Sequence, residues 1–365
     1  MIYLDNGATS FLKPPQVRIA VQQAMTRCAN PGRGGHKPAM EAAKTVFQCR
    51  ETAGELFDCD PEQVVFTPNC TQSLNMAINT LVKPGAAVAI SGFEHNAVVR
   101  PLYAKNAVLR IAGRRLFDPE DTLEQFENAL KKGVSAAVFT HCSNVFGYIL
   151  PVEEMGALCK QYGVPFILDA AQSAGTIPVS LRGLGADFIA MPGHKGLLGP
   201  QGTGMLLCGR VPEPLIRGGT GSSSKSREMP GQLPETGEAG TLNVPGIAGL
   251  NAGMKWLQQA GISNVFFREK KAAEICAEGL KKLGYSVFSG KNQGGTVSFV
   301  GEADCEEIAQ KLARQGIAVR AGLHCAPLAH ESAGTLETGT VRISFGHDAT
   351  LRQVRRFLQI MNTIG

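Results

Sequence analysis

Short apolar runs recur along the chain, and segments with helical spacing lie between many of them. The runs are four or five residues long and rich in valine, isoleucine, phenylalanine and alanine, which indicates buried strands. They cover residues 64–67, 87–90, 108–111, 136–140, 164–168 and 187–191. Helical patterns separate several of them, for instance over 122–132 and 152–162. Strands that alternate with helices predict βαβ units around a mostly parallel sheet.

The remaining elements are predicted from the positions of proline and glycine and from the spacing of apolar residues. Proline near the start predicts one helix over about 15–28, and apolar spacing predicts a second over 38–57. Residues 217–240 are rich in glycine, serine and proline, so a long irregular loop is expected there. A helix from about 245 to 256 and a long helix over 262–283 lead into a last region that again alternates strand and helix.

Composition narrows the class of protein. The chain has 365 residues, of which 44% are hydrophobic and 18% charged, enough for two or three domains with a buried core. The formal charge of +5 is spread along the sequence. Its densest basic patch, over 352–356, lies on a predicted terminal helix, so a nucleic acid is not expected as a partner.

The ten cysteines form no C-x-x-C pair, and several lie in apolar runs, which argues against a secreted disulfide framework. No apolar run approaches the roughly 18 residues that a bilayer-spanning helix needs, and no secretory leader is expected ahead of Tyr3. No His-Glu-x-x-His pattern is present, so we expect no metal site. These features predict a cytoplasmic protein with reduced thiols and no membrane partner.

One lysine, Lys195, lies among glycines and prolines directly after the apolar run 187–191. In isolation, such a lysine is more often a solvated turn residue. The upstream context changes this interpretation, because Asp169 ends the run 164–168, and the carboxyl ends of parallel strands are where open α/β sheets bind ligands. A desolvated lysine can attack a carbonyl. Lysine on the aldehyde and aspartate on the ring nitrogen are what pyridoxal phosphate requires.

These residues carry a resemblance to a known family. Asp169-Ala-Ala-Gln-Ser, followed by Gly193-His-Lys-x-x-Gly-Pro, resembles the class V aminotransferases, which have the fold-type I pyridoxal phosphate architecture. The most similar groups are the group II cysteine desulfurases and the selenocysteine lyases, and the resemblance runs from Tyr3-Leu4-Asp5-Asn6 to Arg342.

The resemblance implies an α/β fold. It has a large domain around a mostly parallel seven-stranded sheet, whose strand at 202–208 is antiparallel, and a small α+β C-terminal domain. We expect residues 1–15 to pack with the small domain, 16–255 to form the large cofactor-binding domain, and 256–365 to form the small one.

The segment 67–73 joins a strand to an apolar helix, and free N–H groups at a helix start bind phosphate. Helix capping explains this stretch equally well by itself. The resemblance favours the phosphate and implies Cys70, Thr71 and Gln72 as its ligands, with Cys70 in place of the usual threonine. It implies His194 as a further phosphate contact, beside Pro192 where many relatives have serine.

Other cofactor contacts are implied by the same resemblance. Thr241 would reach the cofactor phosphate of a neighbouring subunit, which implies a homodimer with a shared active site. His95, which by position alone is more often structural, would stack on the pyridine ring and assist proton transfer. Asn144 would bridge cofactor and substrate, Asp169 would keep the ring nitrogen protonated, and Gln172 would contact the ring 3-oxygen.

The loop Arg320-Ala-Gly-Leu-His-Cys325 is the second decisive stretch. Cys325 could be an ordinary apolar cysteine, but Arg320 and a Gly-rich loop favour a reactive thiolate. In group II desulfurases the matching cysteine forms the persulfide. Arg342 has the planar fork that binds a carboxylate, and the resemblance implies that it holds the substrate, with His36 as a further substrate contact.

The predicted function is therefore a pyridoxal-phosphate-dependent cysteine desulfurase. Lys195 would act as the base and Cys325 as the nucleophile, converting L-cysteine to L-alanine and a Cys325 persulfide that an acceptor protein collects. The alternative within enzymes is a selenocysteine lyase acting on L-selenocysteine, and an aminotransferase would leave Cys325 without a role. A non-catalytic scaffold is the alternative from another class.

Overall fold

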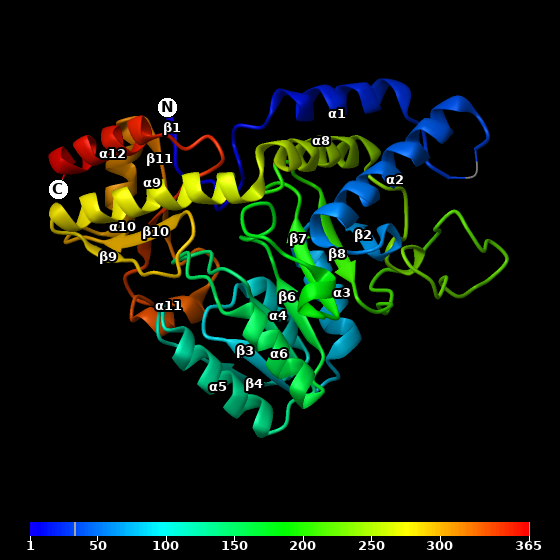
Figure 1. Cartoon of the computed structure of the whole chain (residues 1–365), viewed down its shortest axis with the longest axis horizontal. Coiled ribbons are helices and arrows are strands. Elements are labelled where there is room, and N and C mark those ends of the chain that lie inside the picture. The colour runs from blue at the N-terminus through cyan, green and yellow to red at the C-terminus, as the bar shows by residue number, and fades with distance from the viewer. Residues whose placement is uncertain (33, 365) are drawn as a thin grey trace.

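The computed structural model describes residues 1–32 and 34–364. A seven-stranded sheet forms its centre (Figure 1). In spatial order the strands are β2 (Val64–Thr67), β8 (Gly204–Cys208), β7 (Phe188–Pro192), β6 (Phe166–Asp169), β5 (Ala136–Thr140), β3 (Ala87–Ser91) and β4 (Val108–Ala112). Only β8 runs antiparallel to its neighbours β2 and β7. The predicted mostly parallel sheet and its antiparallel strand are confirmed.

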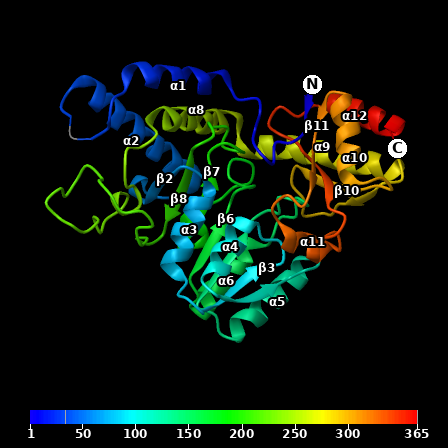
Figure 2. The same ribbon diagram turned by 180° about the vertical axis from the view of Figure 1, so that it is seen from behind.

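Both faces of this sheet are buried, which explains why its strands read as continuous apolar runs. Successive residues of a strand point to opposite faces, so Val88, Val138 and Ile167 join one core cluster while Ala89 and Phe139 join the other. The helices around the sheet are α1 (Pro15–Arg27), α2 (Lys37–Phe57), α3 (Cys70–Leu81), α4 (Asn96–Ala104), α5 (Pro119–Lys131), α6 (Val152–Tyr162), α7 (Leu181–Leu184) and α8 (Val244–Ala260). Figure 2 shows α3 and α4 on the face opposite α5 and α6.

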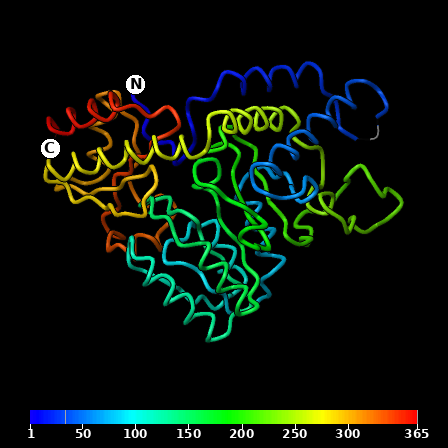
Figure 3. Tube along the Cα trace, in the orientation of Figure 1, coloured from blue at the N-terminus to red at the C-terminus, as the bar shows by residue number. Residues whose placement is uncertain are grey.

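A second core lies beside the first, in the lobe that contains both ends of the chain (Figure 3). Its antiparallel sheet has the order β12 (Arg320–Gly322), β13 (Thr340–Ser344), β10 (Thr296–Val300) and β9 (Ser286–Phe288). A parallel pair, β1 (Ile2–Tyr3) with β11 (Ile317–Ala318), adds the N-terminal residues. The helices of this lobe are α9 (Ile262–Lys282), α10 (Cys305–Arg314), α11 (Pro327–Ala333) and α12 (Leu351–Ile364).

The N-terminal segment contributes to this smaller lobe, since Leu4 is buried in its core together with Phe299 and Phe357. The boundary expected after residue 255 falls inside α8, which ends at Ala260, and Gly261 with a φ of 79° separates α8 from α9. We propose that the domains divide at Gly261.

The loop expected over 217–240 is irregular apart from a short 3-10 helix at Glu235–Gly237, and a further 3-10 turn lies at Pro61–Gln63. Helix α4 has no counterpart among the sequence predictions, because Pro101 interrupts its pattern. None of the helices within residues 1–32 and 34–364 has the length and apolarity needed to cross a bilayer.

Candidate active site

A cavity at the carboxyl edge of the large sheet collects most of the predicted cofactor residues. Parallel strands end together at this edge, so side chains from distant parts of the sequence meet there. The residues of interest that line the cavity are Cys70, Thr71, His95, Asn144, Asp169, Gln172, His194 and Lys195. Pro192, the predicted departure from serine, also lines it. Gln72, Thr241, His36, Arg342 and Cys325 are outside the lining.

Lys195 follows β7 in a tight turn, where the Leu198 N–H donates to the Lys195 carbonyl at 2.9 Å. Burial of the amine lowers the pKa of Lys195, and the positive charge of Arg342 lowers it further. Cys70 and Asp169 act in the opposite direction. A lysine with a lowered pKa holds its free amine more readily, which is the form that attacks a carbonyl.

Asp169 ends β6 and is 2% exposed. Its Oδ1 accepts hydrogen bonds from the Ala171 N–H at 2.9 Å and from the Cys70 thiol at 3.7 Å. Burial raises the pKa of this carboxyl, and the Ala171 N–H, Lys195 and Cys70 counteract that rise. Oδ2 has no hydrogen bond to the described residues, so one oxygen of a cavity-lining carboxyl remains available for a ring N–H.

His95 is the N-cap of α4, and its Nδ1 accepts the Ala97 N–H at 3.0 Å. A neutral imidazole that accepts at Nδ1 carries its proton on Nε2. Burial lowers the pKa of His95 to about 4, with smaller contributions from the charges of Lys195 and Arg342. The ring is therefore neutral at pH 7 and has a defined tautomer.

The N-terminus of α3 opens on the cavity through Cys70 and Thr71. The amides at the first positions of a helix have no carbonyl partner within the helix, so these two N–H groups suit a phosphate. The Gln72 N–H is already capped by Asn69 Oδ1 at 2.9 Å. Of the three residues expected as phosphate ligands in this loop, Gln72 is thus the one whose amide is occupied.

Two further predicted contacts are held by the N-terminal segment. Nδ1 of His194 lies 3.1 Å from the Thr9 hydroxyl, and burial lowers the pKa of His194 to about 4. Nε2 of Gln172 donates to the Gly7 carbonyl at 3.0 Å. A buried amine, a buried carboxyl with a free oxygen and an open helix N-terminus in one cavity together fit pyridoxal phosphate.

Arg342 lies in β13 and is 3% exposed. Its Nη2 donates to Asp5 Oδ1 at 2.7 Å and its Nη1 to the Asn144 carbonyl at 3.0 Å. Nε is buried and has no hydrogen-bond partner among the described residues. The guanidinium predicted to hold the substrate carboxylate is thus connected to the cavity through Asn144, and Asp5 already occupies part of its fork.

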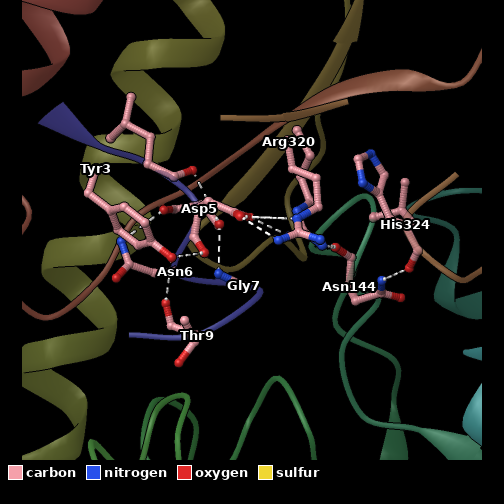
Figure 4. A network of polar contacts seen from close by, with 12 residues as sticks. Tyr3, Asp5, Asn6, Gly7, Thr9, Asn144, Arg320 and His324 are labelled. Atoms are coloured by element: carbon pink, nitrogen blue, oxygen red, sulfur yellow. Dashed lines mark hydrogen bonds and ion pairs between the residues drawn. The ribbon is translucent and has the colours of Figure 1, made fainter. Parts of the chain in front are cut away.

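Cys325 lies in a turn beside these groups. The Ala326 N–H donates to the Leu323 carbonyl at 2.9 Å, and His324 and Cys325 have φ values of 51° and 57°. The Asn144 side chain donates to the His324 carbonyl at 2.8 Å, as Figure 4 shows. The Asn96 N–H donates to the Cys325 carbonyl, also at 2.8 Å. Cys325 is the exposed cysteine; the other nine are buried or half-buried.

Comparison with known proteins agrees with this geometry. The family model described as aminotransferase class-V matches residues 2–357. The chain belongs to the class-V aminotransferase family. The family and the fold implied by the sequence motifs are thereby confirmed.

Relatives within the family include a probable cysteine desulfurase of Pyrococcus abyssi, which is 32% identical over 383 aligned residues that cover 100% of this chain and 94% of the relative. The cysteine desulfurase of Haloferax volcanii is 30% identical, with 94% of this chain and 85% of the relative covered. Among solved structures, the apo cysteine desulfurase from Thermococcus onnurineus NA1 has a TM-score of 0.92 at 32% identity and covers 100% of this chain and 94% of that one. An Escherichia coli cysteine desulfurase in its S-sulfonic acid form has a TM-score of 0.85 at 26% identity, with 99% and 94% covered.

Two residues implied by the family resemblance lie away from the cavity of this chain. Thr241 is exposed and lines a different cavity with Arg50 and Glu238. His36 is exposed at the N-terminus of α2. Neither contact is made within the single chain, so their roles stay predictions that need a second subunit. Within residues 1–32 and 34–364, no cluster of His, Cys, Asp and Glu is arranged to hold a metal ion.

The site residue that sequence reasoning missed is Asp5. It is 8% exposed and binds both Arg342 and Arg320. The motif Tyr3-Leu4-Asp5-Asn6 was a sign of the family, but a single aspartate near the N-terminus does not indicate which distant cation it meets. Arg320, expected to favour the Cys325 thiolate, donates hydrogen bonds from its guanidinium to Asp5.

Proposed function

We propose that this protein is a pyridoxal-phosphate-dependent cysteine desulfurase, which removes sulfur from L-cysteine and leaves L-alanine. The observation that carries the proposal is the exposed Cys325, whose neighbour His324 accepts a hydrogen bond from Asn144 of the cavity that Lys195 and Asp169 line. The cysteine desulfurase relatives, similar over nearly their whole length, support it. An aminotransferase would need the lysine and aspartate but would have no use for the cysteine.

The cofactor contacts follow from the free groups of the cavity. When bound, pyridoxal phosphate supplies an electron sink for the negative charge that develops on the substrate carbon. Lys195 would hold its aldehyde, the free Oδ2 of Asp169 its ring N–H, and the amides of Cys70 and Thr71 its phosphate. Pro192 has neither a hydroxyl nor an N–H to offer. The phosphate would therefore be bound by the N-terminus of α3 and by His194.

The reaction assigns one role to each remaining residue. The Lys195 amine takes the α-proton of the substrate. The neutral His95 can donate a hydrogen bond from its Nε2–H. The Cys325 thiolate attacks the substrate sulfur, so that an S–S bond forms as the carbon–sulfur bond breaks. The electron pair left on the β-carbon takes up a proton, and the proton held by Lys195 returns to the α-carbon, which gives alanine and a Cys325 persulfide. Arg342 binds the substrate carboxylate.

The proposal includes partners that a single chain cannot show. The persulfide sulfur is passed to an acceptor protein, which the exposed position of Cys325 permits. A homodimer would bring Thr241 and His36 of one subunit to the cavity of the other. The free cysteines and the lack of disulfides among them suit the reducing cytoplasm.

The test compares alanine production from L-cysteine and L-selenocysteine by the wild type, Cys325→Ala and the matched control Cys28→Ala. Cys28 is half-buried in the segment after α1, so its loss should leave both reactions unchanged. Cys325→Ala should abolish turnover of L-cysteine while the visible absorbance of bound cofactor persists. Full activity in Cys325→Ala would remove the persulfide step from the proposal. Little cysteine turnover in the wild type, with selenocysteine turnover kept in Cys325→Ala, would establish the lyase instead.

A further inference from the structure

Two arginines face each other at the edge of the active site. Arg320 in β12 and Arg342 in β13 are directly opposite in the antiparallel register. Like charges in such a cross-strand pair repel, and Arg342 is almost fully buried. A pair of this kind requires a negative group between its members, and the chain supplies one from more than three hundred residues away.

Asp5 is that group. Its Oδ1 accepts from Arg342 Nη2 at 2.7 Å, and its Oδ2 accepts from Arg320 Nη2 at 2.9 Å and Nε at 3.0 Å. Figure 4 shows the Asp5 carboxylate facing Arg320. An isolated bridge between Asp5 and Ser344 sets the backbone of Asp5 against β13, so the carboxylate is not held by its ion pairs alone.

The positions of the two arginines differ in a way that matters for binding. The Arg342 side chain is 3% exposed, whereas that of Arg320 is 51% exposed. Arg320 is therefore accessible to solvent in the single chain. The cluster of two guanidinium groups and one carboxylate carries a net charge of +1, which one further carboxylate would neutralise.

We propose that Asp5 is a positioning residue that occupies part of the substrate-carboxylate site on Arg342 and transfers to Arg320 when a substrate carboxylate binds. The inference rests on the proposed role of Arg342 in substrate binding. Asp5 neutralises and orients the buried fork in the absence of substrate, and the incoming carboxylate takes over Nη2 together with the unpartnered Nε. Arg320 then holds the displaced aspartate, so its charge is never left unpaired.

This exchange gives Asp5 and Arg320 opposite effects on ligand affinity. Asp5 competes with the substrate carboxylate, so Asp5→Asn should strengthen carboxylate binding. Arg320 draws Asp5 away from Arg342, so Arg320→Gln should leave Asp5 entirely on Arg342 and weaken binding. Each change should be on the order of tenfold, which corresponds to about 1.4 kcal/mol.

The test measures dissociation constants by calorimetry for L-alanine and for ethylamine, which differ in the carboxylate alone. The proteins, all loaded with cofactor, are the wild type, Asp5→Asn, Arg320→Gln and the double variant. Asp60→Asn and Arg182→Gln remove an exposed ion pair of 2.6 Å on the far part of the large lobe and serve as matched controls. Because the measurement needs no turnover, it is independent of whether the wild type desulfurates L-cysteine.

The expected result is tighter alanine binding in Asp5→Asn, weaker binding in Arg320→Gln, and no change for ethylamine. In the double variant most of the Arg320→Gln effect should disappear, since its route through Asp5 is gone. Weaker binding in both single variants, with lower unfolding midpoints, would assign Asp5 a structural role only and overturn the proposal. An Arg320→Gln effect of full size in the double variant would do the same. If Asp5→Asn does not fold, Asp5→Glu, which keeps the charge but displaces it, should still alter alanine affinity and spare ethylamine.

Discussion

The tautomer and charge of His95 can be tested directly. Burial lowers its pKa from the ordinary 6.5 to about 4, and the neighbouring Lys195 charge adds to the effect. A pKa lower by about 2.5 corresponds to about 3 kcal/mol against protonation. At about pH 5.5 the ring would be about 97% neutral, whereas an ordinary histidine would be about 10% neutral.

The assay is a nitrogen-15 NMR titration of the imidazole rings in the protein without bound cofactor, so that the Lys195 amine is free. The variant His95→Gln assigns the His95 signals among the seven histidines. The Nδ1 shift should be that of an unprotonated acceptor, and the Nε2 shift that of a bonded N–H, down to about pH 5. Lys195→Ala should raise the pKa only partly, because burial is the larger cause. A midpoint near 6.5 in the wild type, or full restoration by Lys195→Ala, would refute this account of the site.

Two more predictions concern buried groups: Cys70, which lines the candidate active site, and Glu269, which lines a second cavity that shares Lys195 and Gln172 with it. Burial raises the pKa of Glu269 to about 8, so the contribution of this carboxyl to stability is fullest below about pH 4.5 and is lost as the pH rises toward 8. Glu269→Gln should abolish a loss of about 2 kcal/mol between about pH 6 and pH 8, measured from the urea unfolding free energies of variant and wild type at each pH. The same pH dependence in variant and wild type would contradict it. Cys70→Ala removes a hydrogen bond to Asp169, so cofactor affinity should fall roughly two- to tenfold in a fluorescence titration. Cys70→Ser should restore it, and equal affinity in the alanine variant would show that the thiol does not support Asp169.

Much of the large sheet was predictable because local pattern and tertiary environment agree there. Strands covered by helices on both faces must be apolar throughout, and the runs ending at Asp169 and before Lys195 show it. The position of both residues at the carboxyl edge then follows from the parallel order of the strands. These two residues, with His95 and Asn144, line one cavity.

Contacts that depend on register and on distant segments were not predictable in this way. No local pattern indicates that Arg320 pairs opposite Arg342, because that register is set by the β12–β13 packing. Asp5 is 337 positions from Arg342. Helix α4 was hidden by Pro101, although its N-cap, His95, was singled out for its chemistry. The family resemblance identified Arg342 as a substrate-binding residue, but it did not indicate that Asp5 would accept a hydrogen bond from its guanidinium.

These distant contacts have a mechanical consequence, because the first residues of the chain connect the two halves of the site. The Ser10 N–H and hydroxyl both donate to the His194 carbonyl at 3.0 Å, next to Lys195. A few residues earlier, the Asn6 side chain donates to the Ser344 carbonyl at 3.1 Å, two positions after Arg342. The turn that contains Lys195 and the strand β13 that contains Arg342 are thus both hydrogen-bonded to one short segment, residues 5–10. The segment 5–10 therefore helps to set the distance between the cofactor amine and the substrate carboxylate site, together with the direct bond from Arg342 to the Asn144 carbonyl.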